Sequence, residues 1–229
     1  MDPRPPALAR RLPGDARRAQ ILREAARLFG SHGFDGTTTR DVAARVGLTE
    51  AALYRYFPSK EAMYAAILDE RIAAPDLVAP LEPVARRGDD RAVFRGLALA
   101  LLESVEADPT FLRLVLYSAL EGHELARPFQ EKRILRLREF LSRYIERRTR
   151  EGAFRGIDPA LAARTFIGMV VNHLIGRHIF GQREQHAHPP AEIADAFVSI
   201  FLDGVRSPPG QSGAAPRRSQ RRSPRSRRG

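Results

Sequence analysis

The chain has 229 residues, of which 43% are hydrophobic, so it is long enough to form one large domain or two smaller ones with a substantial core. It contains no cysteine, which excludes disulfides, thiolate metal sites and a cysteine nucleophile. The formal net charge is +11, but residues 207–229 hold seven arginines and no acid, which leaves +4 for the rest of the chain. The charge supports nucleic-acid binding but is too unevenly distributed to establish it.

The N-terminal segment and the overall hydropathy favour a protein outside the membrane. The first residues, MDPRPPALARRLPG, lack the apolar core of a signal peptide. No run approaches the roughly 18–20 apolar residues that a membrane span requires. We therefore expect a cytoplasmic protein.

Residues 1–14 are rich in proline and arginine and are predicted to be a disordered N-terminal arm. Such an arm either stays free in solvent or reaches a phosphate or the minor groove.

From Asp15 to about His32 the sequence predicts an amphipathic helix, because apolar residues recur at helical spacing, and Gly33 ends it. These apolar residues are Ile21, Leu22, Ala25, Leu28 and Phe29.

Two short helices joined by a tight turn are predicted within residues 37–60, TTTRDVAARVGLTEAALYRYFPSK. Thr38 is placed to cap the first helix, and Asp41 completes a variant of the capping box. Gly47 supplies the left-handed conformation that ends this helix, and Thr49 caps the next one. Two helices joined in this way form a helix-turn-helix, whose second helix lies in the DNA major groove.

The run F-x-G-T-T-x-R-D-V-A, followed by V-G-L-T-x-x-x-L-Y-R-Y-F-P-S-K-E, resembles the DNA-binding domain of the TetR/AcrR family of bacterial transcriptional regulators. The resemblance extends from Asp15 to Leu68, about a quarter of the chain. It implies an all-α, dimeric protein. We expect a three-helix helix-turn-helix DNA-binding domain over residues 15–73 and a C-terminal helical bundle for ligand binding and dimerisation over residues 74–206.

Four residues are candidates for DNA phosphate contacts, since hydroxyl and ammonium groups at helix starts and on the second helix can donate to phosphate oxygens. In the family, the matching positions commonly hold the DNA backbone. For one of them, Tyr56, partial burial beside Phe57 is the alternative. The four candidates are Thr38, Tyr54, Tyr56 and Lys60.

Base reading is assigned to the second helix and the start of the first. Arg40 can pair bidentately with guanine, Glu50 can accept from cytosine N4, and Ala51 or Ala52 can meet a thymine methyl. Many relatives have a neutral or basic residue at the position of Glu50, so its acid needs a base or Arg55 as a partner. The candidate base contacts are Arg40, Thr49, Glu50, Ala51, Ala52 and Arg55.

Beyond Ser59 a helix is predicted to run to about Ala73, and Pro75, Pro80 and Pro83 lead into a polar connection. Further helices are expected at about 90–106, 109–122, 125–151, 159–181 and 190–205. Asp108-Pro109 and Asp158-Pro159 are helix-start signals. No strand-like alternation bounded by hairpin turns is present, so the predicted fold is all-α.

The helix at 159–181 is apolar around its circumference and must be covered on all sides. It is either the core of a monomer or, together with the helix at 190–205, half of a four-helix dimer interface, and the second reading fits a symmetric DNA target. The predicted interface residues are Gly168, Val171, Leu174, Ile175, His178, Phe197, Ile200 and Phe201.

Polar residues on the apolar C-terminal helices are candidates for a small-molecule pocket, since such pockets are mostly apolar with a few polar groups. Each is also a candidate for an ordinary satisfied core or interface group. The spacing of the histidines, with no carboxylate joining them, predicts no metal site, and we expect no cofactor. The pocket candidates are Tyr117, His123, Phe166, Met169, Asn172, His173 and Arg177.

These patterns predict a homodimeric repressor that binds double-stranded DNA at a palindromic operator and is released by a small apolar ligand. The alternative is a nonspecific RNA- or chromosome-binding protein that acts through the arginine-rich tail at residues 207–229, which is predicted to be disordered. A phosphate loop, a nucleophile elbow and a paired acid motif are all absent from the sequence, so we do not expect an enzyme.

Truncation after Val205 is expected to lower nonspecific DNA affinity and to flatten its salt dependence, because Arg206 and the seven arginines of residues 207–229 are removed. The ranking of operator variants should not change, since the tail has no aromatic residue for stacking. Log affinity against log salt, measured on operator and random DNA for both proteins, checks this. Loss of operator preference in a folded, truncated protein would assign sequence reading to the tail.

Overall fold

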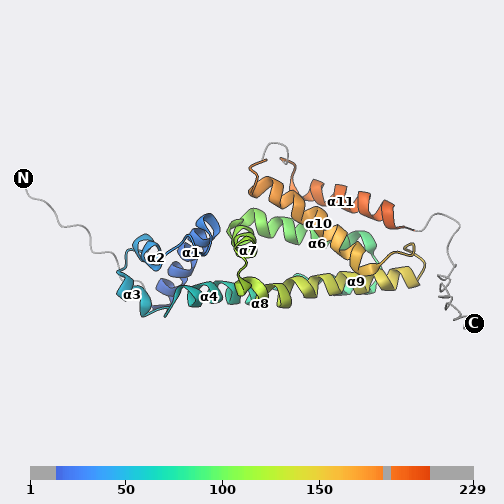
Figure 1. Ribbon diagram of the computed structural model, residues 1–229. Coiled ribbons are helices and arrows are strands. Elements are labelled where there is room, and N and C mark those ends of the chain that lie inside the picture. The colour runs from blue at the N-terminus through green and yellow to red at the C-terminus, as the bar shows by residue number, and fades with distance from the viewer. Residues whose placement is uncertain (1–13, 183–186, 207–229) are drawn as a thin grey trace, which may run out of the picture.

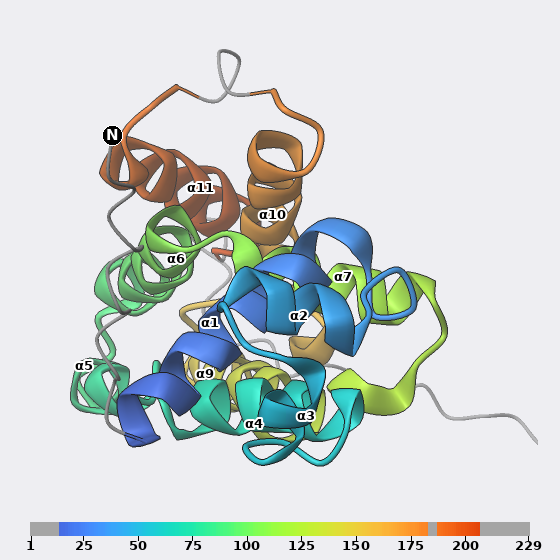
Figure 2. The ribbon, with the colours of Figure 1, turned by 90° about the vertical axis from the view of Figure 1, so that its left-hand side faces the viewer.

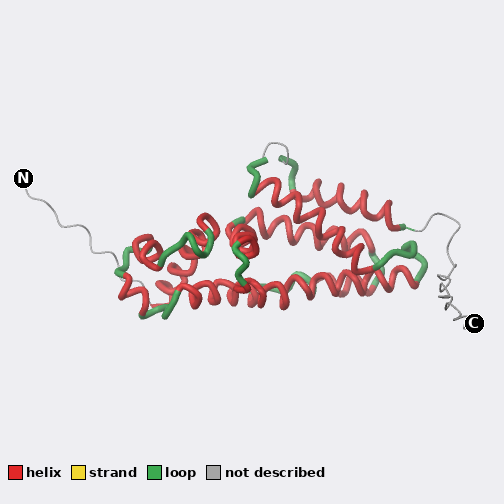
Figure 3. The backbone as a smooth tube through the Cα atoms, viewed as in Figure 1, coloured by secondary structure: helices red, strands yellow, loops and turns green. Residues whose placement is uncertain are grey.

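The computed structural model describes residues 14–182 and 187–206, and in these residues every regular element is helical (Figures 1 and 3). The predicted C-terminal tail and all but the last residue of the predicted N-terminal arm lie outside the described residues. The elements are α1 Gly14–His32, α2 Thr39–Arg45, α3 Glu50–Tyr54, α4 Lys60–Ala73, the 3₁₀ helix η1 Ala79–Leu81, α5 Glu82–Arg86, α6 Asp90–Ala107, α7 Thr110–Leu120, the 3₁₀ helix η2 Glu124–Ala126, α8 Arg127–Phe129, the π-helix η3 Gln130–Ile134, α9 Leu135–Arg150, α10 Pro159–His178 and α11 Pro190–Val205. None of the described helices is long and apolar enough to cross a lipid bilayer.

The predicted all-α fold is confirmed, with two local differences. The connection expected after Pro75 contains η1 and α5, because Pro80 and Pro83 occupy first-turn positions, where a helix needs no N–H. The helix expected at 125–151 is broken into η2, α8, η3 and α9.

The helix-turn-helix lies at one end of the molecule, and the long helices of the C-terminal half extend away from it (Figure 1). In Figure 2, turned so that this end faces the viewer, α2 and α3 lie in front. The core of this end contains a cluster of Phe29, Phe34 and Tyr64, with 5.5 Å between ring centroids. The Tyr64 hydroxyl donates to the carbonyl of Leu114 on α7, and burial raises the pKa of Tyr64 to about 12. Helix α7 therefore contributes to the N-terminal core, although it follows α6 in the chain.

A second core fills the C-terminal half between α6, α9, α10 and α11. The ring of Phe94 lies 4.8 Å from that of Phe166 and 5.0 Å from that of Phe201. Two predictions are corrected here. Phe166 is fully buried in this core and lines neither of the two surface grooves of the C-terminal half described below, and Leu174 and Phe201 are buried within the protomer and are not available to a partner. A helix that is apolar on several sides does not reveal from its sequence which side faces its own chain.

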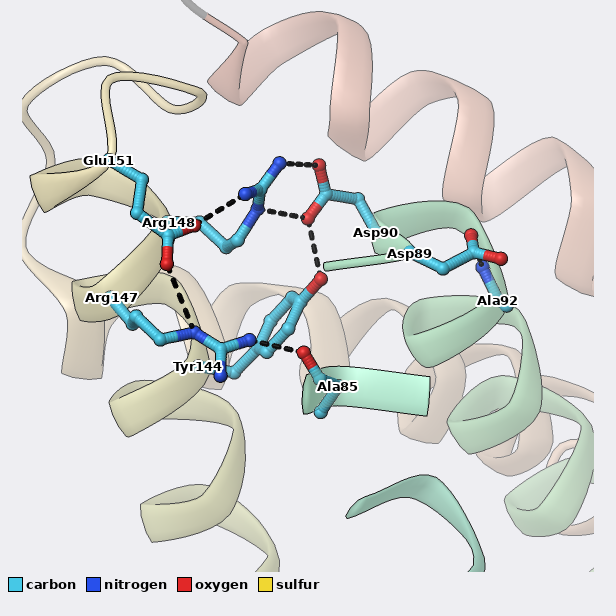
Figure 4. Close-up of polar contacts among 8 residues, drawn as sticks. All are labelled: Ala85, Asp89, Asp90, Ala92, Tyr144, Arg147, Arg148 and Glu151. Atoms are coloured by element: carbon cyan, nitrogen blue, oxygen red, sulfur yellow. Dashed lines mark hydrogen bonds and ion pairs between the residues drawn. The ribbon is translucent and has the colours of Figure 1, made fainter. Parts of the chain in front are cut away.

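At the end far from the helix-turn-helix, a network of polar side chains joins α6 to α9 (Figure 4). Asp90 accepts the hydroxyl of Tyr144 at 2.6 Å and two guanidinium nitrogens of Arg148 at 2.8 and 3.1 Å. Burial, reinforced by Asp90, raises the pKa of Tyr144. Arg147 donates to the carbonyl of Ala85 and so ties α9 to α5 as well. The carboxylate of Asp90 is therefore satisfied from one direction by a bidentate pair and from another by a phenol.

We expect Asp90→Ala to lower the free energy of unfolding by about 2–3 kcal/mol, because it leaves a largely buried guanidinium and a phenol without their acceptor. Asp195→Ala is the matched control. Asp195 also pairs with two arginines, Arg91 and Arg95, but its side chain is 40% exposed against 14% for Asp90, so its loss should cost about 1 kcal/mol or less. Urea denaturation of both variants checks the difference. Equal effects would show that burial does not set the strength of these pairs.

Candidate nucleic-acid interface

The first helix of the helix-turn-helix, α2, begins with the predicted capping box. The Thr38 N–H donates to Asp41 Oδ2 at 2.9 Å, and the Asp41 N–H donates to Thr38 Oγ1 at 3.1 Å. The side-chain hydrogen bond from Thr38, followed by the backbone one, lowers the pKa of Asp41. A lowered pKa means that the cap stabilises the fold above the usual aspartate range and is lost as the pH falls through the folded-state value.

The turn and the second helix also form as the sequence predicts. Gly47 has φ +67°, a conformation that favours glycine. Thr49 accepts the N–H of Ala52 at 3.2 Å and caps α3, and Leu53 is fully buried beneath it. Arg17 of α1 donates to the carbonyl of Val46 at 3.2 Å and holds the turn from outside. The orientation of α3 is thus fixed by local caps and by one buried anchor.

Several predicted DNA-contact residues lie exposed on this unit. The guanidinium groups of Arg40 and Arg55 form no hydrogen bond or ion pair with another described residue, so both are free to meet a base or a phosphate. Tyr54 is 46% exposed, whereas Tyr56 is half-buried and packs against the N-terminal core. The partial burial considered for Tyr56 is therefore present, and its phosphate contact stays a prediction. Of the other base-contact candidates, Thr49 and Ala51 are exposed and Ala52 is half-buried.

The sequence left a base or Arg55 as the possible partner of Glu50. In the structure Glu50 does not pair with Arg55. Its carboxylate accepts the hydroxyl of Thr39 on α2, and the Tyr54 hydroxyl lies 3.3 Å from that same Thr39 oxygen. These contacts link the two helices of the motif across the side that bears the exposed residues. Sequence reasoning missed Thr39, because Thr39 and Glu50 are 11 residues apart and meet only through the angle between the helices.

Lys60, a predicted phosphate contact, is engaged within the protein. Its ammonium donates to the carbonyls of Phe34 at 2.8 Å and Thr37 at 3.0 Å and lies 4.2 Å from the centroid of the Phe34 ring. These bonds join the start of α4 to the loop between α1 and α2. An ammonium has three N–H groups, so one donor remains for a phosphate.

The predicted ligand-pocket residues are not brought together. Tyr117 donates to the carbonyl of Ser31, and His123 lies 3.2 Å from Asp35, so both face the N-terminal domain. Asn172 is exposed, and His173 is buried with its ring 5.9 Å from that of Phe197. The two remaining candidates are Met169, half-buried against the C-terminal core, and Arg177, paired with Glu106.

Two grooves open on the surface of the C-terminal half within the described residues, and none of the predicted pocket residues lines them. The larger, about 590 Å³, lies between α9 and the start of α10, and the smaller, about 320 Å³, lies between α5 and α9. The larger is lined by Leu135, Arg138, Glu139, Ser142, Arg143, Asp158, Ala160, Leu161 and Arg164, and the smaller by Glu82, Ala85, Arg86, Phe140, Arg143, Tyr144, Arg147 and Arg150.

The outer face of α10 and α11 retains part of the predicted dimer interface. Gly168 is exposed, Ile200 is 65% exposed, and Val171, Ile175 and Phe197 are half-buried. His178 is mostly buried against Glu106, at 3.2 Å. Phe180, just beyond α10, is 72% exposed and is not one of the predicted interface residues.

Helix α7 carries functional candidates that the sequence analysis overlooked. Arg113 donates to the carbonyl of Gly30 in α1 and to that of His178 at the end of α10, both at 3.1 Å. Glu121 accepts the N–H of Phe34 at 3.0 Å. Arg113 and Tyr117 on α7 and Glu121 just after it recur every four residues, so one side of this segment lies along the end of α1 and the loop that follows it. That spacing of polar residues was the available sequence signal.

The capped, exposed two-helix unit defines a helix-turn-helix DNA-binding protein with a separate helical C-terminal domain. Comparison with known protein families supports this assignment. Residues 21–67 match the profile of bacterial regulatory proteins of the tetR family, and residues 93–204 match the C-terminal domain of AefR-like transcriptional repressors.

Similar proteins cover most of the chain. The HTH-type transcriptional repressor KstR2 of Rhodococcus jostii (strain RHA1) is 28% identical over 197 residues, 84% of this chain and 92% of that protein. The nucleoid occlusion factor SlmA of Escherichia coli O1:K1 / APEC is 30% identical over 197 residues, 79% of this chain and 90% of that protein. The crystal structure of the TetR family transcriptional regulator PfmR from Thermus thermophilus superposes with a TM-score of 0.63 at 28% identity, covering 80% of this chain and 97% of that one. The chain belongs to the TetR family of transcriptional regulators.

Because Lys60 is bound to two carbonyls, Lys60→Met is expected to lower the free energy of unfolding by about 1–2 kcal/mol. Arg23→Met is the control, since Arg23 is exposed on α1 without a hydrogen-bond partner among the described residues, and its loss should stay within about 0.5 kcal/mol. Chemical denaturation of both variants distinguishes them. If Lys60→Met changes the free energy of unfolding as little as Arg23→Met does, the two carbonyl bonds add no stability and all three N–H groups of Lys60 are available to DNA.

Proposed function

We propose that this TetR-family regulator is a homodimeric repressor that binds a palindromic operator and is released when a small apolar ligand binds its C-terminal domain. The observation that carries the proposal is the exposed face of the helix-turn-helix, where the guanidinium groups of Arg40 and Arg55 have no partner among the described residues. Unpaired guanidinium groups on a recognition unit suit guanine edges and phosphates. Selection of bound duplexes from a random library tests the proposal, and an enriched inverted repeat is the expected result.

Within this function, we assign phosphate contacts and base contacts to different residues. Tyr54 and Tyr56, with the remaining N–H of Lys60, are proposed to hold phosphates and to set the register of the protein on DNA. Thr38, which the sequence placed in this group, is left out, because its hydroxyl hydrogen and its backbone N–H are both donated to Asp41. Base edges are left to Arg40 and to the start of α3. Phosphate contacts carry no sequence information, so the two groups differ in their effect on base preference.

Arg40→Ala is expected to cost about 1–3 kcal/mol of operator binding and to relax the preference at one base position. Tyr54→Phe should weaken binding about equally across operator variants, because it removes a phosphate donor. Gel-shift titrations on a set of singly mutated operators compare the two. A marked change of base preference in Tyr54→Phe would argue against the phosphate role.

Dimerisation is proposed through the outer face of α10 and α11. Gly168 and Ile200 are exposed on this face and Val171 is half-buried, and Phe180 is exposed just beyond α10, so apolar groups open to a partner gather on these two helices. To read a palindromic site, a twofold pairing of this face has to set two recognition helices roughly 34–36 Å apart, in successive major grooves. The family membership supports a dimer, since regulators of this class act on symmetric sites.

Val171→Glu combined with Ile200→Glu should give a folded monomer, because unpaired charges in an apolar interface cost several kcal/mol. Leu120→Glu is the matched control. Leu120 is also strongly exposed, at the end of α7, and its change should leave the dimer intact. Sedimentation with circular dichroism measures both. A double variant that stays dimeric would move the interface to another surface.

Ligand response is proposed to travel through α7. Ligand binding that favours one arrangement of the C-terminal helices must, by reciprocal linkage, change DNA affinity if the two sites share a movable element. Arg113 contacts both α1 and the end of α10, which supports α7 as that element.

A second candidate function is chromosome binding, favoured by the similarity to SlmA proteins, which are named nucleoid occlusion factors. The arginine-rich tail would then supply affinity without sequence preference. Selection from random duplexes separates the candidates, since the second predicts no enriched sequence for a protein that acts through its tail.

A further inference from the structure

Three side chains on the recognition unit form a directed chain of hydrogen bonds. The Thr39 hydroxyl has a single hydrogen, which it donates to Glu50 Oε1. The oxygen of Thr39 can then only accept from Tyr54, whose hydroxyl lies 3.3 Å away. The direction of the chain is therefore Tyr54 to Thr39 to Glu50, because a carboxylate has no hydrogen to give.

This direction determines what the start of α3 offers to DNA. Glu50 is the first residue of α3 and is half-buried, with one carboxylate oxygen bound to Thr39. Its second oxygen has no hydrogen-bond partner among the described residues and can act only as an acceptor. If Tyr54 turns its hydrogen toward a phosphate, the bond from Thr39 to Glu50 persists, since Thr39 is the donor in it.

We propose that Thr39 is a positioning residue that holds the Glu50 carboxylate as an acceptor for an exocyclic amino group on a base edge in the major groove, either cytosine N4 or adenine N6. The inference rests on the proposed function as a sequence-specific DNA binder. It names Thr39, which makes no base contact itself, as a determinant of operator preference.

The same arrangement rejects other bases. Guanine and thymine present acceptor oxygens in the major groove at the corresponding positions, and a carboxylate facing them is left without a donor. The carboxylate also repels the DNA backbone, so it costs affinity on every sequence that lacks the amino group. Specificity here comes from an unfavourable contact with wrong sites as well as a favourable one with the right site.

The first experiment removes the amino group and the carboxylate separately. Wild-type protein selects its duplex from a random library, and the base facing Glu50 is replaced by an analogue without the amino group, 2-pyrimidinone for cytosine or purine for adenine. The wild type should lose about tenfold in affinity, whereas Glu50→Ala should bind both duplexes equally, because the two changes remove one shared interaction. Additive effects would overturn the proposal.

Glu50→Gln separates the two bases, since glutamine pairs well with adenine through N6 and N7. If adenine is read, Glu50→Gln should keep the preference, and if cytosine is read, it should lose it. In either case nonspecific affinity should rise, because a negative charge is removed from the DNA-facing side. The matched control is Glu70→Gln, an exposed glutamate on α4 with no hydrogen-bond partner among the described residues, which removes the same charge and should leave base preference unchanged.

Thr39 is tested with Thr39→Val, which removes only the hydroxyl, and Thr39→Ser, which restores it. Thr39→Val should reduce discrimination at the Glu50 base about tenfold, and Thr39→Ser should recover it, while both keep native helix content and melting temperature within a few degrees. If Thr39→Val discriminates like the wild type, Thr39 has no positioning role. If the wild type itself selects no sequence, the proposed function fails; if it selects one and Glu50→Ala keeps the same preferences, only this inference fails.

Discussion

The packing of α7 along the end of α1 is the contact on which the arrangement of this molecule depends. The two helices approach so closely that an added Cβ at Gly30 would lie 3.0 Å from the carbonyl oxygen of Thr110. Leu114 enters the N-terminal core, and Arg113 bonds to the backbone of both α1 and α10. Helix α7 therefore connects the end of α10 to α1 through direct contacts. The DNA-binding unit and the C-terminal helices meet along α7, although their hydrophobic cores are separate.

The loop between α1 and α2 is the second point at which the two halves meet. Lys60, the first residue of α4, donates to two of its carbonyls, and Glu121, just after α7, accepts the N–H of Phe34. His123 approaches the same loop from beyond α7, 3.2 Å from Asp35. Polar side chains from three segments thus pair with backbone or side-chain groups of one short loop, and this loop leads directly into the capping box of α2. A regulator needs such a contact, since coupling between two sites requires an element that both of them bias.

Acidic side chains take different roles according to their partners. Asp90 is held by a bidentate arginine and a tyrosine, and it stabilises the far end of the bundle. Asp41 is exposed and caps α2. Glu50 is bound by a single hydroxyl, and its second oxygen has no hydrogen-bond partner among the described residues. Whether a carboxylate is structural or a candidate for base contact depends on how many hydrogen-bond donors surround it and on which of its oxygens they reach. It depends less on whether the residue is Asp or Glu.

The sequence by itself determined the helix-turn-helix, because the signals that form it are local. Thr38 and Asp41, Gly47, Thr49 and Ser59 act within three residues of their partners, so their spacing in the chain predicts the caps and the turn that the structure contains. Only the tertiary structure decided which side of α10 and α11 is buried, placing Leu174 and Phe201 in the core and Ile200 on the surface. It also decided that Glu50 meets Thr39 and that Lys60 meets the loop before α2. These contacts span 11 to 26 residues and depend on the angles between helices, which are set by side-chain packing and are not encoded in any short pattern.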